Sequence, residues 1–147
     1  MSKAARAIIV ENGKMLVMYR NKYSSEYFTL VGGRVNEGET TEEALIREVR
    51  EETGLTVTAA RLVFVEEQPA PYNSQYIYLC EVAPHGDVQL GVNSEEGMMN
   101  RLGMNIHEPR WVNASALSSM PFRSPNLHKA IIEALQKGFP EQPVKLS

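Results

Sequence analysis

The stretch that decides the fold runs from Gly32 to Leu55 and reads GGRVNEGETTEEALIREVREETGL. Thr40 and Glu43 have the spacing of a capping box, in which each side chain bonds the backbone N–H of the other residue at the start of a helix. Gly54 follows as a residue suited to the left-handed conformation that ends many helices. The stretch therefore predicts one helix over 40–53, introduced by a pair of glycines.

One face of this helix carries three carboxylates. Glu48, Glu51 and Glu52 stand at i, i+3 and i+4 and lie within one turn, whereas Leu45, Ile46 and Val49 fall on the other side and are expected to pack on the sheet. Like charges at this spacing destabilise a helix, and a bound divalent cation removes that cost. A Glu-rich exposed face is also common on ordinary solvated helices, so the helix alone leaves a metal site and a solvated face both open.

Outward from the helix, the chain reads as alternating strands and turns. Apolar runs at 7–10 and 15–18 flank an Asn-Gly turn and predict a β-hairpin. The remaining expected elements are strands at 27–31, 61–67, 75–82 and 110–112, and a helix that begins at 124–125 and ends at 138. Strands mixed with helices in this order predict an α/β fold, with a mixed sheet covered by helices on its faces.

Composition sets the limits of function. The 147 residues carry a formal charge of −3, which suits one soluble domain over 1–140 with a loosely held tail at 141–147. An acidic chain lacks the field that attracts a nucleic acid polymer or an anionic membrane, and no run approaches the roughly 18 apolar residues of a membrane span. The one cysteine, Cys80, fits a reducing compartment, so we expect a cytoplasmic protein.

The wider spacing of the glycine and carboxylate residues is more specific. Gly33 is followed after five residues by Glu39, and Glu39 after seven residues by REVREETGL, which begins at Arg47. This pattern resembles the Nudix box, the signature of the Nudix hydrolase family, with every defining position filled. A chance match in a chain of this length is on the order of one in ten million from average residue usage.

The resemblance implies a fold and a metal site. A Nudix domain is an α/β/α sandwich, which the predicted elements fit. By the same resemblance, Glu48, Glu51 and Glu52 hold Mg²⁺ or Mn²⁺ and the carbonyl of Gly32 is a further ligand. The family pattern also gives Arg47 and Glu39 supporting roles, Arg47 holding the carboxylates and Glu39 bracing the loop onto the helix.

The reaction implied is hydrolysis of the diphosphate linkage in a nucleoside diphosphate derivative. A general base must take the proton of the attacking water. In the family this base is either a Glu of the box or a Glu on a later loop, so Glu48 competes with Glu95 and Glu96, which lie in the aperiodic segment 87–108. Glu108 is a weaker candidate because it lies near the start of a predicted strand.

The substrate is left between alternatives. Family markers conflict, since Pro69 and Pro71 bracket the position typical of ADP-ribose hydrolases while Tyr72 meets that of diadenosine polyphosphate hydrolases. We rank an ADP-ribose-like substrate first, an oxidised or ordinary nucleoside triphosphate second, and a non-catalytic nucleotide-binding module third. Phe28, Tyr72 and Tyr76 are the aromatic candidates for stacking on a base.

Two further expectations concern Cys80 and assembly. A prenyl diphosphate isomerase would need a reactive cysteine near the site, but Cys80 lies in an apparent strand and reads as a small buried hydrophobe. We expect a small-molecule nucleotide as the partner. A homodimer is left open, because one sequence identifies no interface.

Overall fold

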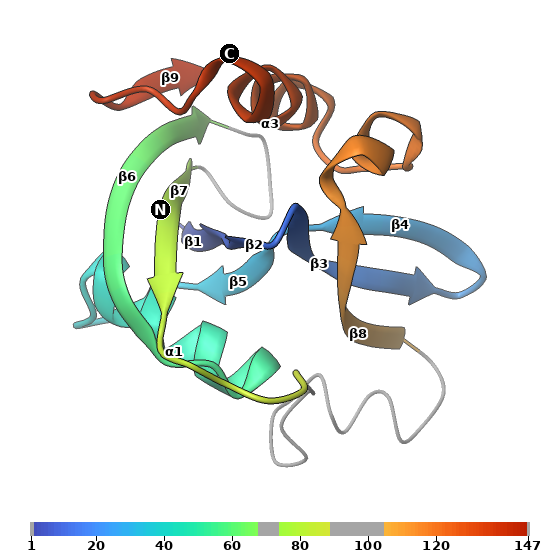
Figure 1. The fold of residues 1–147 in the computed structure, drawn as a ribbon. Helices are drawn as coiled ribbons and strands as arrows, with labels where there is room; N and C mark the ends of the chain where they lie inside the picture. Colours follow the sequence, from blue (N-terminus) through green and yellow to red (C-terminus); the bar gives the residue numbers. More distant parts are fainter. Residues whose placement is uncertain (1, 68–73, 89–104, 147) are drawn as a thin grey trace.

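The computed structural model describes residues 2–67, 74–88 and 105–146 (Figure 1). Its elements are β1 (Lys3–Ile8), β2 (Val10–Glu11), β3 (Lys14–Lys22), β4 (Ser25–Thr29), β5 (Val31–Arg34), α1 (Thr41–Thr53), β6 (Val57–Glu67), β7 (Ser74–Val82), β8 (Asn105–Asn113), the 3₁₀ turn η1 (Ala114–Ser119), α3 (Pro125–Lys137) and β9 (Val144–Leu146). None of the helices in these ranges is long and apolar enough to cross a membrane.

The strands form two sheets. The first has the order β5-β1-β7-β6-β9 and is mixed, because β1 runs parallel to β7 and β6 parallel to β9, while the other pairs are antiparallel. The second is antiparallel and joins β2, β3 and β4, with β8 on the other edge of β3. In Figure 1, β1, β5 and β7 lie between α1 and α3. This arrangement confirms the predicted α/β fold with a mixed sheet and helices.

Alternation along the strands divides the core into two clusters. In β1, Ala5 and Ala7 belong to the cluster beneath α1, which includes Leu45 of the helix, whereas Ile8 belongs to the cluster with Ile131 of α3. Successive side chains of a strand point to opposite faces, so β1 serves both clusters. Each helix buries an apolar stripe against one of them. Ile46, which was expected to pack on the sheet with Leu45 and Val49, is instead 43% exposed.

The local signals around α1 are confirmed in detail. Thr40 Oγ1 accepts a hydrogen bond from the backbone N–H of Glu43 (3.1 Å), and Glu43 Oε1 accepts one from the N–H of Thr40 (2.9 Å). Gly54 closes the helix with φ of 79°, in the left-handed region. The Asn12–Gly13 turn is confirmed as well, with positive φ at both residues and β2 paired to β3.

Several boundaries differ from the sequence expectation, and the strands expected at 61–67 and 110–112 begin earlier, at Val57 and Asn105. The strand expected at 7–10 is divided, since β1 ends at Ile8 in the first sheet and Val10 starts β2 in the second. The strand expected at 27–31 breaks at Leu30 for the same reason. The segment 141–147, expected to be loosely held, contains β9, whose backbone pairs with that of Phe64 to Glu66 in β6. These pairings join residues far apart in sequence, where local patterns carry little information.

Candidate active site

A cleft of about 610 Å³ lies where the glycine pair of β5 meets α1. Its walls come from β1, β3, β4, β5, α1, β8 and the loop before α1. The residues that line it are Arg6, Met18, Arg20, Thr29, Gly32, Gly33, Arg34, Asn36, Arg47, Glu48, Glu51, Glu52, Asn105 and His107.

The two glycines bring backbone onto the carboxylates of α1. Gly32 has φ of 137°, and a Cβ there would lie 2.1 Å from the carbonyl oxygen of Ala5. The N–H of Gly32 donates to Glu52 Oε1 at 2.7 Å. A Cβ on Gly33 would lie 2.6 Å from the carboxyl carbon of Glu48. Both positions therefore require glycine. A side chain at Gly32 would collide with the backbone of β1, and a side chain at Gly33 would collide with the Glu48 carboxylate.

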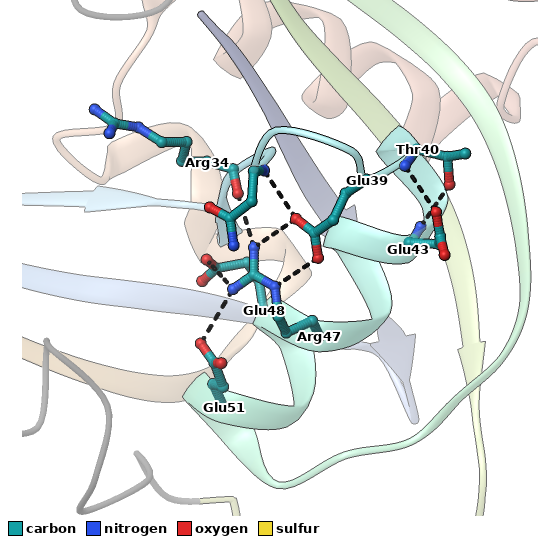
Figure 2. A network of polar contacts seen from close by, with 8 residues as sticks. Arg34, Glu39, Thr40, Glu43, Arg47, Glu48 and Glu51 are labelled. Carbon is teal, nitrogen blue, oxygen red and sulfur yellow. Dashed lines mark hydrogen bonds and ion pairs between the residues drawn. The ribbon is translucent and has the colours of Figure 1, made fainter.

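Arg47 gathers the acidic side chains of this region (Figure 2). Its guanidinium donates to Glu39 through two nitrogens, at 2.8 and 3.0 Å, to Glu48 Oε1 at 2.9 Å and to Glu51 Oε2 at 3.3 Å. A further bond reaches the carbonyl of Arg34 in β5 at 3.0 Å. The planar fork of arginine supplies donors in several fixed directions, so one side chain fixes both the loop and two carboxylates.

The charge state of the network follows from these contacts. Hydrogen bonds from Arg47, and then from the backbone N–H of Asn36, lower the pKa of Glu39. The bond to Glu39 raises the pKa of Arg47, even though partial burial of the guanidinium opposes the shift. Both groups are therefore charged at neutral pH. This ion pair is what the expected bracing role of Glu39 requires.

The three carboxylates of the helix differ in exposure. Glu48 and Glu52 are buried, at 8% and 3% of full exposure, whereas the side chain of Glu51 is 43% exposed. In the described part of the chain, no three His, Cys, Asp or Glu side chains converge closely enough to hold a metal ion. Instead Arg47 binds Glu48, and the N–H of Gly32 binds Glu52. The carboxylates of Glu48, Glu51 and Glu52 offer oxygen atoms, the type of ligand that Mg²⁺ and Mn²⁺ prefer.

The cleft also has cationic walls that sequence reasoning missed. Arg6, Arg20 and Arg34 line it together with the carboxylates, and Arg20 donates to Asn105 Oδ1 at 2.8 Å. The available signal was a single arginine between Ala5 and Ala7 in an apolar strand. Burial, with a smaller effect of the Arg20 charge, lowers the pKa of His107 to about 4, so its ring is neutral at pH 7.

The chain is similar in sequence to several known proteins. The model of the NUDIX domain matches residues 1–135. The chain belongs to the Nudix family. A NAD-capped RNA hydrolase NudC of Chromobacterium violaceum is 26% identical over 134 residues, which cover 90% of this chain and 46% of that protein. An ADP-ribose pyrophosphatase of Methanocaldococcus jannaschii is 42% identical over 67 residues, 45% of this chain and 40% of the other. The chain thus spans about half the length of these curated relatives or less.

Solved structures agree on the fold. A MutT NUDIX hydrolase from Burkholderia pseudomallei superposes with a TM-score of 0.63 at 22% identity, covering 89% of this chain and 95% of that one. The Nudix box, from Gly33 to Leu55, accordingly forms the end of β5, the loop that carries Glu39, helix α1 and the turn at Gly54.

Three other candidate residues of this Nudix domain, Phe28, Tyr76 and Glu108, do not line the cleft. Phe28 and Tyr76 are absent from the cleft lining; Phe28 packs on the α3 cluster and Tyr76 on the α1 cluster. Glu108 lies in β8 and pairs with Arg110. Glu95, Glu96 and Tyr72 lie outside the described residues.

Cys80 is buried in β7, in the α1 cluster. Burial raises the pKa of its thiol to about 12. A thiol is a poor nucleophile when it is protonated, so Cys80 has the properties of a core residue, as expected from the sequence.

Proposed function

We propose that this protein is a metal-dependent hydrolase that cleaves the diphosphate linkage of a nucleoside diphosphate derivative. The observation that carries the proposal is the pairing of opposite charges in one cleft. Glu48, Glu51 and Glu52 face it from α1, and three arginines line it from β1, β3 and β5. Carboxylates suit a divalent cation, and guanidinium groups bind phosphate oxygens in a bidentate way.

The chemistry of these oxygen donors suits a divalent metal ion, although the three carboxylates do not converge on one point in the described part of the chain. Glu48, Glu51, Glu52 and the carbonyl of Gly32 would hold Mg²⁺ or Mn²⁺, an all-oxygen set of donors. The missing side chain of Gly33 leaves the space in which the Glu48 carboxylate lies. When bound, such an ion neutralises phosphate charge and lowers the pKa of a water molecule.

The chain's own residues have separate tasks in this proposal. Arg6, Arg20 and Arg34 would bind the oxygens of the diphosphate and favour the charge that develops when water attacks one phosphorus. Arg47 keeps the Glu48 carboxylate in place. Among the described residues, Glu48 is the candidate that would take the proton of the attacking water, and Glu95 and Glu96 remain the alternatives. The bond that breaks is the one from the attacked phosphorus to the bridging oxygen, which leaves with the second phosphate.

An ADP-ribose-like compound is the first choice of substrate. The support is the stretch of 67 residues that is 42% identical to an ADP-ribose pyrophosphatase. The relative named as a NAD-capped RNA hydrolase makes the 5′ end of an RNA a substrate to be tested as well, although net charge argues against binding along a nucleic acid backbone. A cytoplasmic location and a homodimer stay predictions.

A substrate screen tests the proposal directly. The purified protein, with Mg²⁺ or Mn²⁺, is incubated with ADP-ribose, nucleotide sugars, NADH, diadenosine polyphosphates, nucleoside triphosphates and a 5′ NAD-capped oligoribonucleotide. We expect two phosphate-bearing products from a diphosphate derivative, and hydrolysis in ¹⁸O-labelled water identifies the attacked phosphorus. Tight nucleotide binding without turnover of any compound would instead support the alternative of a non-catalytic nucleotide-binding module.

Glu52→Gln tests the metal assignment. This change keeps the size of the side chain but removes a charge, so we expect turnover to fall by roughly 100-fold or more, because metal ligation supplies several kcal/mol of stabilisation to the transition state. The matched control is Glu133→Gln on the exposed face of α3, whose carboxylate pairs with Lys137. Equal activity in Glu52→Gln and the control would overturn the assignment.

A further inference from the structure

A chain of buried and part-buried hydrogen bonds runs from the start of α3 to the backbone of Gly32. The hydroxyl of Ser124 donates to Glu66 Oε2 at 2.6 Å, and Gln75 Nε2 donates to Glu66 Oε1 at 3.3 Å. Arg6 Nε then donates to Gln75 Oε1 at 3.0 Å, and its Nη1 donates to the carbonyl of Gly32 at 3.1 Å. The chain thus links residues from three strands and the cap of α3 to one end of the cleft.

The middle of this chain lies inside the protein. Glu66 is 3% exposed and Gln75 7% exposed, and neither lines the cleft. Removing a carboxylate from water is costly, and apolar side chains of similar volume often stabilise a core equally well or better. A contribution to stability therefore does not explain why a carboxylate is buried at Glu66. Control of side-chain orientation explains the presence of both Glu66 and Gln75.

Glu66 decides which way the Gln75 amide points. The carboxylate oxygens of Glu66 accept hydrogen bonds from Ser124 and Gln75, so the NH₂ of Gln75 faces Glu66 and its oxygen faces Arg6. The reversed amide would place its NH₂ group against the guanidinium, donor against donor. Gln75 in turn fixes the Nε side of Arg6, and the rigid fork directs the Nη1 side to the carbonyls of Leu30 and Gly32.

Gly32 is consequently held by charged groups at both of its polar atoms. Its N–H binds Glu52, and its carbonyl binds Arg6. We propose that Glu66 and Gln75 are positioning residues which, through Arg6, fix the Gly32 backbone relative to Glu52 and so preorganise the metal site. The inference rests on the function proposed above, in which the Gly32 carbonyl and Glu52 are metal ligands. Groups that orient metal ligands from behind are typically worth 10 to 100-fold in affinity.

Mn²⁺ binding in the absence of substrate tests this role. Gln75→Met keeps the length of the side chain and removes both hydrogen bonds. We expect its Kd for Mn²⁺, measured by electron paramagnetic resonance of the free ion, to rise by about 10-fold or more relative to wild type. The matched control is Glu67→Gln, next to Glu66 but exposed and paired with Lys145, which should leave the Kd unchanged.

Conservative variants separate orientation from packing. Glu66→Gln keeps an acceptor for Gln75, so we expect a Kd within about threefold of wild type, whereas Glu66→Met should match Gln75→Met. A purely structural role predicts that Kd follows the loss of thermal stability instead of the hydrogen-bonding pattern. If Gln75→Met does not fold at the assay temperature, Arg6→Lys takes its place, because one ammonium cannot bridge Gln75 and Gly32 as the fork does, and the same weakening is expected.

Each contrary outcome has a clear meaning. An unchanged Kd in folded Gln75→Met overturns the inference. A lower Kd also overturns it, because the Arg6 charge would then oppose the metal more than its hydrogen bond helps. If wild-type protein itself fails to bind Mn²⁺, the proposed function fails with it, and that result is distinct from the other two.

Discussion

Gly33 shows how a single residue defines the site. Only a hydrogen atom separates its α-carbon from the Glu48 carboxyl group, since a Cβ would lie 2.6 Å from the carboxyl carbon. A long glutamate can usually swing away from such a contact. Here the carboxylate is held by Arg47 at 2.9 Å, so it cannot move without losing that bond. The glycine and the arginine thus act on the same carboxylate from two sides.

Gly33→Ala should therefore damage the site more than the fold. We expect Mn²⁺ affinity and turnover to fall by about 10-fold or more, because the displaced carboxylate is a proposed metal ligand. The thermal midpoint, followed by circular dichroism, should change by only a few degrees. Gly86→Ala is the control, since a Cβ there meets nothing within 4 Å. Normal metal binding in Gly33→Ala would mean that Glu48 moves freely or does not bind the ion.

Helix α1 is the element that joins fold to function. One face packs Leu45 and Val49 into the core, and the other presents carboxylates to the cleft. Its first turn is fixed by the capping box of Thr40 and Glu43. Arg47 and the candidate metal-binding carboxylates follow within two to three turns. The cap therefore also fixes the position of these side chains along the helix.

Thr40→Ala should destabilise the first turn of α1. Loss of the side-chain acceptor for the Glu43 N–H is expected to lower the free energy of unfolding by about 1 kcal/mol, as for other N-caps. Urea unfolding measures the change, and Thr40→Ser, which keeps the hydroxyl, should stay close to wild type. Equal losses in the two variants would show that the threonine methyl group, and not the cap, stabilises the helix.

Local elements were the part of the fold that the sequence could predict. The cap at Thr40, the stop at Gly54 and the Asn12–Gly13 turn each depend on a few neighbouring residues, and all three are present in the structure. Strand pairing depends on distant residues, so the transfer of the chain between sheets after Ile8 and the pairing of β9 with β6 were not foreseen.

The same division applies to the candidate site. The box supplied the carboxylates, Arg47 and Glu39, because its spacing is a local pattern. Arg6 and Arg20 reach the cleft only because β1 and β3 lie beside it in the folded sheets, and nothing adjacent in the sequence marks them. The Glu66–Gln75 contact likewise depends on the register of β6 and β7, in which these two residues are opposite each other.

At the scale of the molecule, charge is unevenly placed. The net charge of −3 gives no hint that several arginines gather at one cleft. The arginines also affect the pKa of His107. This residue lies in β8 and experiences the positive charges of Arg20, Arg6 and Lys22. Burial and these cations both favour the neutral ring, and its pKa falls to about 4. Lowering the pH is therefore expected to reduce the free energy of unfolding of the whole protein through this residue.

The sign of that effect follows from proton linkage. Between about pH 6.5 and pH 4 the histidine of the unfolded chain binds a proton that the folded ring does not, so stability is full above pH 6.5 and is lost as pH falls. We expect the free energy of unfolding of wild type to drop by about 2 kcal/mol more between pH 7 and pH 5 than that of His107→Gln. Urea unfolding at each pH measures the difference. Proton NMR of the His107 ring supplies the direct check, because a ring that titrates near pH 6.5 in the folded protein, together with parallel stability curves, would contradict the prediction.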